Sequence, residues 1–254
     1  ARENYKNGEC VRVIEWLSYN GRDSREFSVY ITSKNSFDKP ERDVSIVEVP
    51  GRSGDIIIDN GKYKNIKIDY GLKFFSKNFT GWDNYDFASY YDKISEWLKP
   101  TAEYHNLTDS YDPNYYRKAC LKSSIKLKQL HSDVGAFNVS FSCKPYRYRF
   151  DGENTIQLTS DGTIPNPEPE NSLPLIRVVP ISSGDVVFKI TTENGFLSFL
   201  VMNVEDNYVD IDSEAMNVYS GTTNYNNNYV QSVFPSLAPG ENTIEFTTNV
   251  QSIS

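Results

Sequence analysis

The sequence is poor in the residues on which most enzyme and metal sites depend. Only three of its 254 residues are cysteine and two are histidine, and no two cysteines form a C-x-x-C pair. A Gly-x-Ser-x-Gly elbow, a His/Cys cluster and a glycine-rich phosphate loop are all missing. These absences remove the usual signals of nucleophilic catalysis, of metal and redox sites and of nucleotide binding. We therefore expect no enzyme activity, no cofactor and no metal site.

Long apolar runs are also missing. No stretch has the apolar length that spans a bilayer, and residues 1–4 lack the apolar core of a signal peptide. We expect no membrane partner and a chain that folds in a cytoplasm. Cys10, Cys120 and Cys143 are odd in number and far apart. We expect them to be small buried hydrophobic residues rather than disulfide partners.

Positive charge is nearly absent from the second part of the chain. Residues 151–254 hold 2 Lys and Arg against 14 Asp and Glu, whereas residues 1–150 hold 24 against 20. The composition also shifts near residue 150, where Pro165, Pro167, Pro169 and Pro174 follow in linker-like sequence. We predict two domains, 1–150 and 151–254, that face different partners. The interspersed charges of the first and the acidity of the second argue against specific nucleic-acid binding.

Residues 44–75 predict two strand pairings around a rigid loop. Residues 44–49 and 56–58 indicate strands, and Pro50-Gly51-Arg52-Ser53-Gly54 interrupts them, because proline has no amide donor and glycine admits positive φ. Asp59-Asn60-Gly61 is the residue set of a tight hairpin turn. A period of two then predicts a half-buried strand with one apolar face: Ile66, Ile68, Tyr70, Leu72 and Phe74. Arg52 either pairs with Asp55 or lies at a subunit or tube contact.

Other parts of residues 1–150 carry weaker signals. Residues 10–17 and 27–32 indicate strands, and the polar residues 33–43 a connector or an exposed arm. Residues 85–99 predict the one convincing helix, with an apolar stripe at helical spacing, a cap at Asp83 or Asn84 and a stop at Pro100. From residue 119 the alternation predicts a strand that pairs with residues 137–143. Its lysine row forms a solvated face or, alternatively, a contact surface or channel lining: Lys118, Lys122, Lys126 and Lys128.

Residues 151–254 read as a β-sandwich or jelly roll. Short strands separated by turn residues are predicted at 155–159, 175–180, 185–191, 196–202, 208–212 and 243–248. Asp210 and Asp212 suggest calcium, but Ala215 stands where an EF-hand loop needs glycine, so a solvated hairpin end is the favoured interpretation.

Several of these segments together resemble one family. VPGRSGD followed by DNGKYKN resembles the signature of the distal tail proteins of long-tailed bacteriophages that infect Gram-positive bacteria. DPNYYRKA and GAFNVSFSCKPYRY resemble the end of that family's ring domain. YVDIDSEAMNVY, with FPSLAPGEN downstream, resembles its C-terminal domain. The resemblance therefore extends over both halves of the chain.

The resemblance implies a mainly β fold. Residues 1–150 would form an N-terminal β-sandwich with one packed α-helix, tiled into a homohexameric ring. Residues 151–254 would form a peripheral sandwich similar to lectins or carbohydrate-binding modules. The implied function is a structural hub in the virion, at the distal end of the tail. It would join the tail tube protein to the tail-associated tip protein and to a baseplate or receptor-binding protein used in host adsorption. The residues expected to set the ring geometry are Pro50, Gly51, Arg52, Ser53, Gly54, Asn60, Gly61 and Tyr63.

Two alternatives stay open. The second domain could recognise cell-wall sugars, since flat rings stack on sugars and amides bind hydroxyls. The residues for that contact are Tyr219, Asn224, Tyr225 and Tyr229. Asn-rich loops are, however, more often turns that tolerate left-handed φ. A glycosidase would need two carboxylates held roughly 5–10 Å apart, and nothing in the sequence fixes such a pair.

Overall fold

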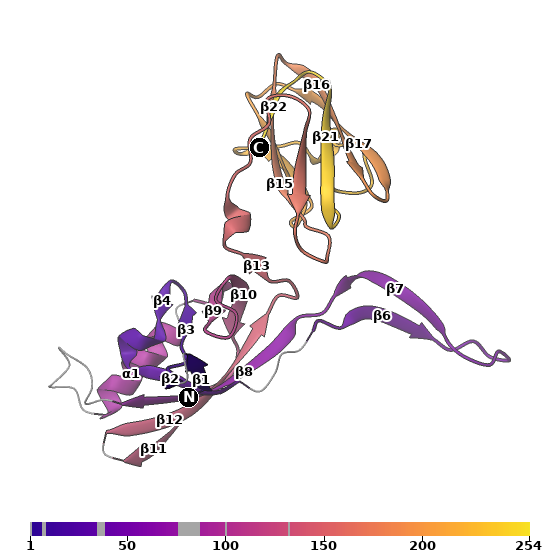
Figure 1. Cartoon of the computed structure of the whole chain (residues 1–254). Coiled ribbons are helices and arrows are strands. Elements are labelled where there is room, and N and C mark those ends of the chain that lie inside the picture. Colours follow the sequence, from indigo (N-terminus) through magenta and orange to yellow (C-terminus); the bar gives the residue numbers. More distant parts are fainter. Residues whose placement is uncertain (1, 7–8, 35–38, 76–86, 100, 132) are drawn as a thin grey trace. The chain divides into compact units, whose positions relative to one another are not determined.

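The structure, a computed structural model, describes residues 2–6, 9–34, 39–75, 87–99, 101–131 and 133–254. The described chain consists mainly of strands with one α-helix, and it divides into two compact units, Ala1–Glu153 and Asn154–Ser254 (Figure 1). The mainly β fold class is thus confirmed. The roles of ring and periphery stay predictions. No helix in the described parts is long and apolar enough to cross a membrane.

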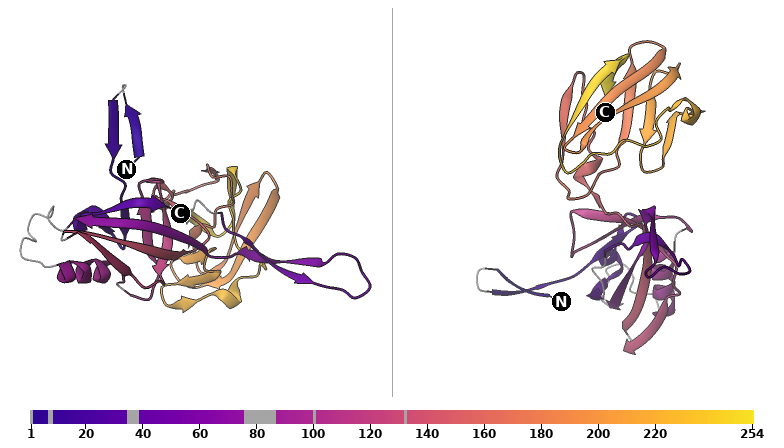
Figure 2. Two further views of the ribbon diagram at one scale, coloured as in Figure 1. Left: turned by 90° about the horizontal axis from the view of Figure 1, so that it is seen from below. Right: turned by 90° about the vertical axis from the view of Figure 1, so that its right-hand side faces the viewer.

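The first unit contains a nine-stranded antiparallel sheet. Its members are β3 (Leu17–Tyr19), β4 (Arg22–Asp23), β5 (Val29–Lys34), β8 (Ile66–Phe75), β9 (His105–Asp109), β10 (Tyr115–Leu121), β11 (Lys126–His131), β12 (Val134–Cys143) and β13 (Tyr148–Arg149). They are ordered β4-β3-β9-β10-β12-β8-β5, with β11 beside β12 and β13 beside β10. Two further ribbons project from this sheet: β1 (Arg2–Lys6) with β2 (Glu9–Val13), and β6 (Arg42–Val47) with β7 (Ile56–Tyr63) (Figure 2).

The pairing of β8 with β12 forms the centre of the sheet. Its register runs unbroken from Ile66 opposite Cys143 to Phe75 opposite Val134. The predicted alternation of β8 is confirmed, because its five apolar residues at even positions are all buried while Lys67 and Lys73 are exposed. Cys143 is buried at the end of this ladder, as predicted, and Cys120 is half-buried. For Cys10 the structure describes the backbone alone.

Helix α1 (Phe87–Leu98) packs its apolar stripe on the core of the first unit, as its spacing predicts. Residues 83–86 and 100, which include the expected cap and stop, lie outside the described residues. Trp97 stacks on Phe27 with ring centroids 4.7 Å apart. Its indole N–H donates to the carbonyl of Tyr19 over 3.0 Å. Aromatic packing and a buried hydrogen bond therefore both fix the helix against the sheet.

Two expectations for the first unit are corrected. The lysine-bearing segment is not one strand, because β10 ends at Leu121 and β11 begins at Lys126, and both pair with β12. The four residues between them bulge, and the hydroxyl of Ser123 accepts a hydrogen bond from the Ser140 amide over 3.2 Å. The strand expected at 27–32 begins two residues later, at Val29, because Ser24–Phe27 form a 3-10 helix.

The second unit is a two-sheet sandwich. Its strands are β14 (Gly162–Asn166), β15 (Leu175–Pro180), β16 (Gly184–Thr192), β17 (Gly195–Val204), β18 (Val209–Asp212), β19 (Asn217–Ser220), β20 (Thr223–Asn224), β21 (Gly240–Thr248) and β22 (Val250–Ile253). One sheet is ordered β14-β21-β16-β17 and the other β20-β19-β18-β15-β22. Aliphatic and aromatic residues of both sheets share one core. The likeness to lectins stays a prediction.

The strand expected at 155–159 is absent from the described chain. Within that range Leu158 forms only an isolated bridge with Ile253, and the nearest strand is β14. β14 contains Pro165, which the sequence analysis placed in a linker. Proline is tolerated in β14 because this strand pairs only with β21, at the edge of its sheet, and edge strands are where sheets accept proline.

Candidate assembly interface

The predicted assembly motif lies on the ribbon β6–β7, which we call the arm. The two strands pair antiparallel, with Val47 opposite Ile56, and Pro50 to Gly54 form the tip of the hairpin between them. Gly51 and Gly54 have φ of +81° and +85°, so both positions need glycine. The Arg52 amide donates to the carbonyl of Val49 over 3.1 Å and tightens the turn. The structure thus places the five tip residues together and in solvent.

The predicted hairpin turn at residues 59–61 is wrong. β7 runs through all three residues without reversing. The register instead shifts, from Val44 opposite Asp59 to Arg42 opposite Tyr63, so the extra residues form a β-bulge. Gly61 has φ of +68°, the left-handed conformation that the sequence signal reported. The prediction of positive φ is thus confirmed at Gly61. A β-bulge and a tight turn both favour Asn-Gly, so these residues alone do not distinguish the two.

Ion pairs hold the base of the arm together. The Arg42 guanidinium pairs with Asp59 and donates to the Tyr63 hydroxyl over 3.3 Å. Lys62 pairs with Asp43 over 3.4 Å. The Gly61 amide, followed by Arg42, lowers the pKa of the Asp59 carboxyl, so Asp59 is ionised. These groups are largely exposed to solvent, so each pair adds little to the stability of the ribbon.

Arg52 is not held by Asp55. Among the described residues, its side chain forms no ion pair and no hydrogen bond, so the first of its two predicted roles is wrong in the isolated chain. Its guanidinium is therefore free at the tip of the arm. The alternative, a contact with another subunit, stays a proposal.

The arm exposes aliphatic side chains on both of its strands. Ile57 is 70% exposed and Ile46 is 64% exposed, and four more are at least 36% exposed: Val47, Val49, Ile56 and Ile58. Fully burying one such side chain contributes about 1.5–3 kcal/mol. A two-stranded ribbon with no sheet beneath it is at best marginally stable in water. The arm therefore has the composition of an element completed by a partner.

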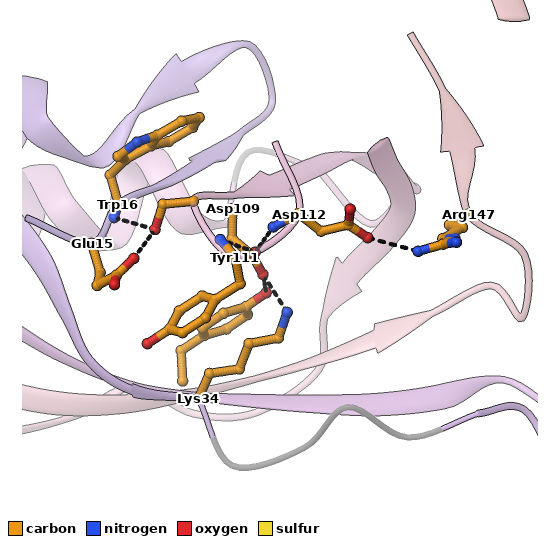
Figure 3. Close-up of polar contacts among 9 residues, drawn as sticks. Glu15, Trp16, Lys34, Asp109, Tyr111, Asp112 and Arg147 are labelled. Atoms are coloured by element: carbon orange, nitrogen blue, oxygen red, sulfur yellow. Dashed lines mark hydrogen bonds and ion pairs between the residues drawn. The ribbon is translucent and has the colours of Figure 1, made fainter. Parts of the chain in front are cut away.

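A buried charge network lies where β5 leaves the sheet toward the arm (Figure 3). The Lys34 ammonium pairs with Asp109 over 2.7 Å, and the two side chains are only 9% and 6% exposed. The Tyr70 hydroxyl donates to the same carboxylate oxygen. The other oxygen accepts the amides of Tyr111 and Asp112 over 3.0 and 3.2 Å. Sequence reasoning missed this network, because its residues are far apart in the chain and none of them belongs to a recognisable motif.

The lysine row stands in two environments. Lys122, Lys126 and Lys128 are exposed, whereas Lys118 is half-buried with its ammonium 4.7 Å from the centre of the Tyr148 ring. A pocket of about 370 Å³ opens at the β10–β11 bulge, beside Lys126 and Asp69. Whether this face is only solvated or also a contact surface stays a prediction.

The proposed sugar contact does not form one platform. Tyr225 is 5% exposed and belongs to the core of the second unit, with its hydroxyl donating to Asp206 over 2.8 Å. Tyr229 is half-buried against Phe234, with ring centroids 4.9 Å apart. Only Tyr219, which is half-buried, and the exposed Asn224 remain accessible on β19 and β20. Burial thus removes Tyr225 from any stacking surface.

The acidic segment at residues 210–214 is only partly a solvated hairpin end. Asp210 is 3% exposed and makes two hydrogen bonds with the Arg177 guanidinium, over 2.7 and 2.8 Å. Asp212 accepts the Ala215 amide over 2.8 Å and caps the turn. In the parts that the structure describes, no cluster of three or more acidic, His or Cys side chains could hold a metal ion.

Comparison with known proteins agrees with these features. Residues 23–143 match the family model described as the phage tail protein RIFT-related domain. No curated protein matches the sequence. Among solved structures, the crystal structure of Dit (gp 19.1) of phage SPP1 has a TM-score of 0.69 and 12% identity, and the match covers 95% of this chain and 97% of that chain. That protein is described as a paradigm of the hub adsorption apparatus in phages that infect Gram-positive bacteria.

The matched region contains both the arm and most of the nine-stranded sheet, so this part of the chain is similar to a phage tail protein domain. The fold is shared with Dit along nearly the whole chain. The resemblance to the distal tail protein family of long-tailed phages is therefore confirmed.

Proposed function

We propose that the chain is the ring-forming hub of a phage tail tip. The observation that carries the proposal is the arm, a projecting ribbon with six exposed aliphatic residues and an unpaired arginine at its tip. Such an element suits a contact with a second copy of the same chain. One arm and one receiving surface per copy make a heterologous interface, and a rotation that closes produces a ring.

The mechanism is geometric rather than chemical, so the protein is structural and not an enzyme. A closed ring has two different faces, one for the tail tube protein and one for the tail-associated tip protein. A baseplate or receptor-binding protein would attach outside it. The hub role described for the SPP1 protein of the same fold supports this arrangement. The site of action is the distal end of the tail in the virion.

The charge of the second unit supports a role apart from the ring contact. Its sequence contains only two cations, Arg177 and Lys189. Arg177 pairs with Asp210 over 2.7 Å and Lys189 with Glu245 over 3.0 Å, so neither is available to a partner as a free charge. The unit therefore presents a net negative surface, which disfavours anionic partners. We propose that it forms the periphery of the hub.

Sugar recognition by the second unit is not adopted as a second function. Two of its four proposed contact residues, Tyr225 and Tyr229, already pack within the unit. Tyr225→Ala would open the core of the second unit, so a loss of sugar binding in that variant would not identify a sugar contact.

The mass of the purified full chain tests the hub. Native mass spectrometry should show a discrete sixfold species, either for the chain alone or after the tail tube or tip protein is added. Interfaces of this kind bury more than about 1,000 Å², so the species should survive dilution to low micromolar concentrations. A chain that remains monomeric alone and with each tail partner would contradict the proposal.

A further inference from the structure

One edge of the second unit is open along part of its length. β17 is the last strand of its sheet and pairs only with β16 (Figure 1). The second part of β17 is covered on its other side. There the Val230 amide donates to the Leu200 carbonyl over 3.2 Å, and the Leu200 amide donates to the Gln231 side chain over 2.8 Å. No described segment covers residues 195–198 in this way, and we call this stretch the free edge.

The main chain of the free edge directs hydrogen-bonding groups into solvent. In an antiparallel pair, the amide and carbonyl of one residue point to the same side, and those of the next residue point to the opposite side. Because Leu200 points both groups away from β16, Phe196 and Ser198 do so as well. Among the described residues, none hydrogen-bonds to these two amides and two carbonyls on that side. Such a row of unpaired groups is a template for an added strand.

The side chains of the free edge are apolar on both faces of the sheet. Phe196 is 65% exposed on the outer face, where the Lys189 ammonium lies 4.7 Å from the centre of its ring. Leu197 lies on the inner face, in line with Phe199 and Val201, which are buried in the core. Leu197 is nevertheless 52% exposed. The core of the sandwich is therefore incomplete at this edge, and a further strand would cover Leu197.

The sequence of β17 does not guard this edge against pairing. Natural sheets protect their edge strands with charged residues or proline, among other devices. β14, at the opposite edge of the same sheet, contains Pro165. β17 reads GFLSFLVMNV and contains neither a charged residue nor a proline. An apolar strand with an open edge is therefore expected to be covered by a partner.

The charge of the second unit indicates the chemistry of that partner. Its sequence contains 14 Asp and Glu against two cations, and both cations pair within the unit. Glu193 is exposed in the turn just before the free edge. A second copy of the chain would bring two net negative units into contact, whereas a cationic segment would be attracted. Charge complementarity therefore favours a cationic partner over a second copy.

We propose that an extended segment of another protein, rich in lysine or arginine, docks on the free edge and adds to the sheet as a further strand. Main-chain hydrogen bonds with Phe196 and Ser198 would supply affinity, and alternate side chains would supply specificity. An apolar side chain opposite Leu197 would complete the core, and cationic side chains would lie on the outer face. The inference stands apart from ring formation, because every group that it uses belongs to the second unit.

Amide hydrogen exchange of the full chain tests the docking site. The probe is a short peptide of alternating valine and lysine, and its matched control is a peptide of alternating valine and glutamate. Exchange at the Phe196 and Ser198 amides is followed at single-residue resolution by nuclear magnetic resonance. We expect the lysine peptide to slow exchange at both amides at least about tenfold, and the glutamate peptide less than about twofold.

Two variants at one position separate docking from folding. Ser198→Pro removes an amide that makes no bond to β16, and edge strands accept proline where the amide faces solvent, so thermal unfolding should shift little. Protection of the Phe196 amide by the lysine peptide should nevertheless be lost. Ser198→Thr, the matched control, keeps the amide and should be protected like the wild type. If Ser198→Pro does not fold, Phe196→Lys places a repelling charge on the same edge, at an exposed side chain, and should also abolish protection.

The outcomes separate this inference from the hub. Protection by neither peptide at millimolar concentration, or by both equally, would overturn the proposed docking site. Protection that appears in the chain alone and grows with its concentration would show that a second copy covers the edge, and would overturn it too. A chain that stays monomeric with every tail partner but binds the lysine peptide at the free edge would contradict the hub and leave this inference.

Discussion

At the scale of single residues, the first unit contains a lysine and an aspartate where apolar side chains would be expected. Lys34 and Asp109 come from strands 75 positions apart in the chain and are nearly inaccessible to solvent. Removing two charges from water is costly, and a buried ion pair often stabilises no more than apolar residues would. The pair joins the end of β5 to β9, so we expect it to fix where the chain leaves the sheet toward the arm.

Removing one partner of this pair should cost more than removing both. Lys34→Met leaves the Asp109 carboxylate buried without its counter-ion and should lower the free energy of unfolding by about 3–5 kcal/mol. The double change Lys34→Met, Asp109→Asn should recover most of that loss, because the amide oxygen still accepts hydrogen bonds. Urea unfolding followed by circular dichroism gives the free energy of unfolding of the wild type, the two single variants and the double variant. Strictly additive losses would show that the two residues are not coupled.

The thiol of Cys143 should make the first unit sensitive to alkali. Burial raises its pKa from 9.0 to about 12, so the folded chain holds this proton more tightly than the unfolded chain does. The stability that this group contributes is complete below the unfolded value and is lost as the pH rises from 9 toward 12. The slope is at most about 1.4 kcal/mol per pH unit.

Cys143→Ala should remove this part of the slope. Urea titrations at pH values of about 8 and about 10 compare the variant with the wild type. The variant starts less stable because it leaves a small cavity, but its stability should fall less between the two pH values. Equal falls in the two proteins would contradict the prediction.

At the scale of elements, glycine in a central strand makes the close packing of β12 possible. A side chain at Gly135 would meet the ring of Phe74, which is fully buried in the core. Gly135→Ala should therefore destabilise the first unit by about 1–3 kcal/mol, the usual cost of overpacking. Gly152→Ala is the matched control, because its nearest neighbour would be 3.7 Å away. Thermal unfolding compares the two, and similar shifts would argue against a packing role.

At the scale of the whole molecule, the scarcity of cations in the second unit gives it few sites for trypsin. Its two sites, Arg177 and Lys189, lie in β15 and β16, each paired on both sides by neighbouring strands. Cleavage needs a locally opened chain, and such strands open rarely. Native digestion should therefore leave Arg177 and Lys189 uncut, so that a fragment containing the whole second unit persists and is identified by mass. Early cuts at Arg177 or Lys189 would show that the second unit is not independently stable.

Sequence reasoning succeeded where a local pattern suffices. The alternation of β8 and the apolar stripe of α1 each predict which side chains are buried, and those side chains are buried in the structure. Sequence reasoning failed where a contact with a distant segment of the chain determines the local structure. Asn60-Gly61 correctly signalled positive φ, but whether such residues form a turn or a bulge depends on how β6 and β7 pair. Tyr225 looked like a surface ring because burial of an aromatic in a polar loop has no local signature.

The sequence by itself determined that the chain is mainly β, that its halves differ in charge and that PGRSG interrupts a strand, because periodicity, composition and backbone restriction act within a few residues. Only the tertiary structure decided that PGRSG forms the tip of a projecting arm, that Lys34 pairs with Asp109 and that Tyr225 and Tyr229 pack within the second unit. Each of these depends on contacts between distant segments, and such contacts are set by packing rather than by the residues on either side.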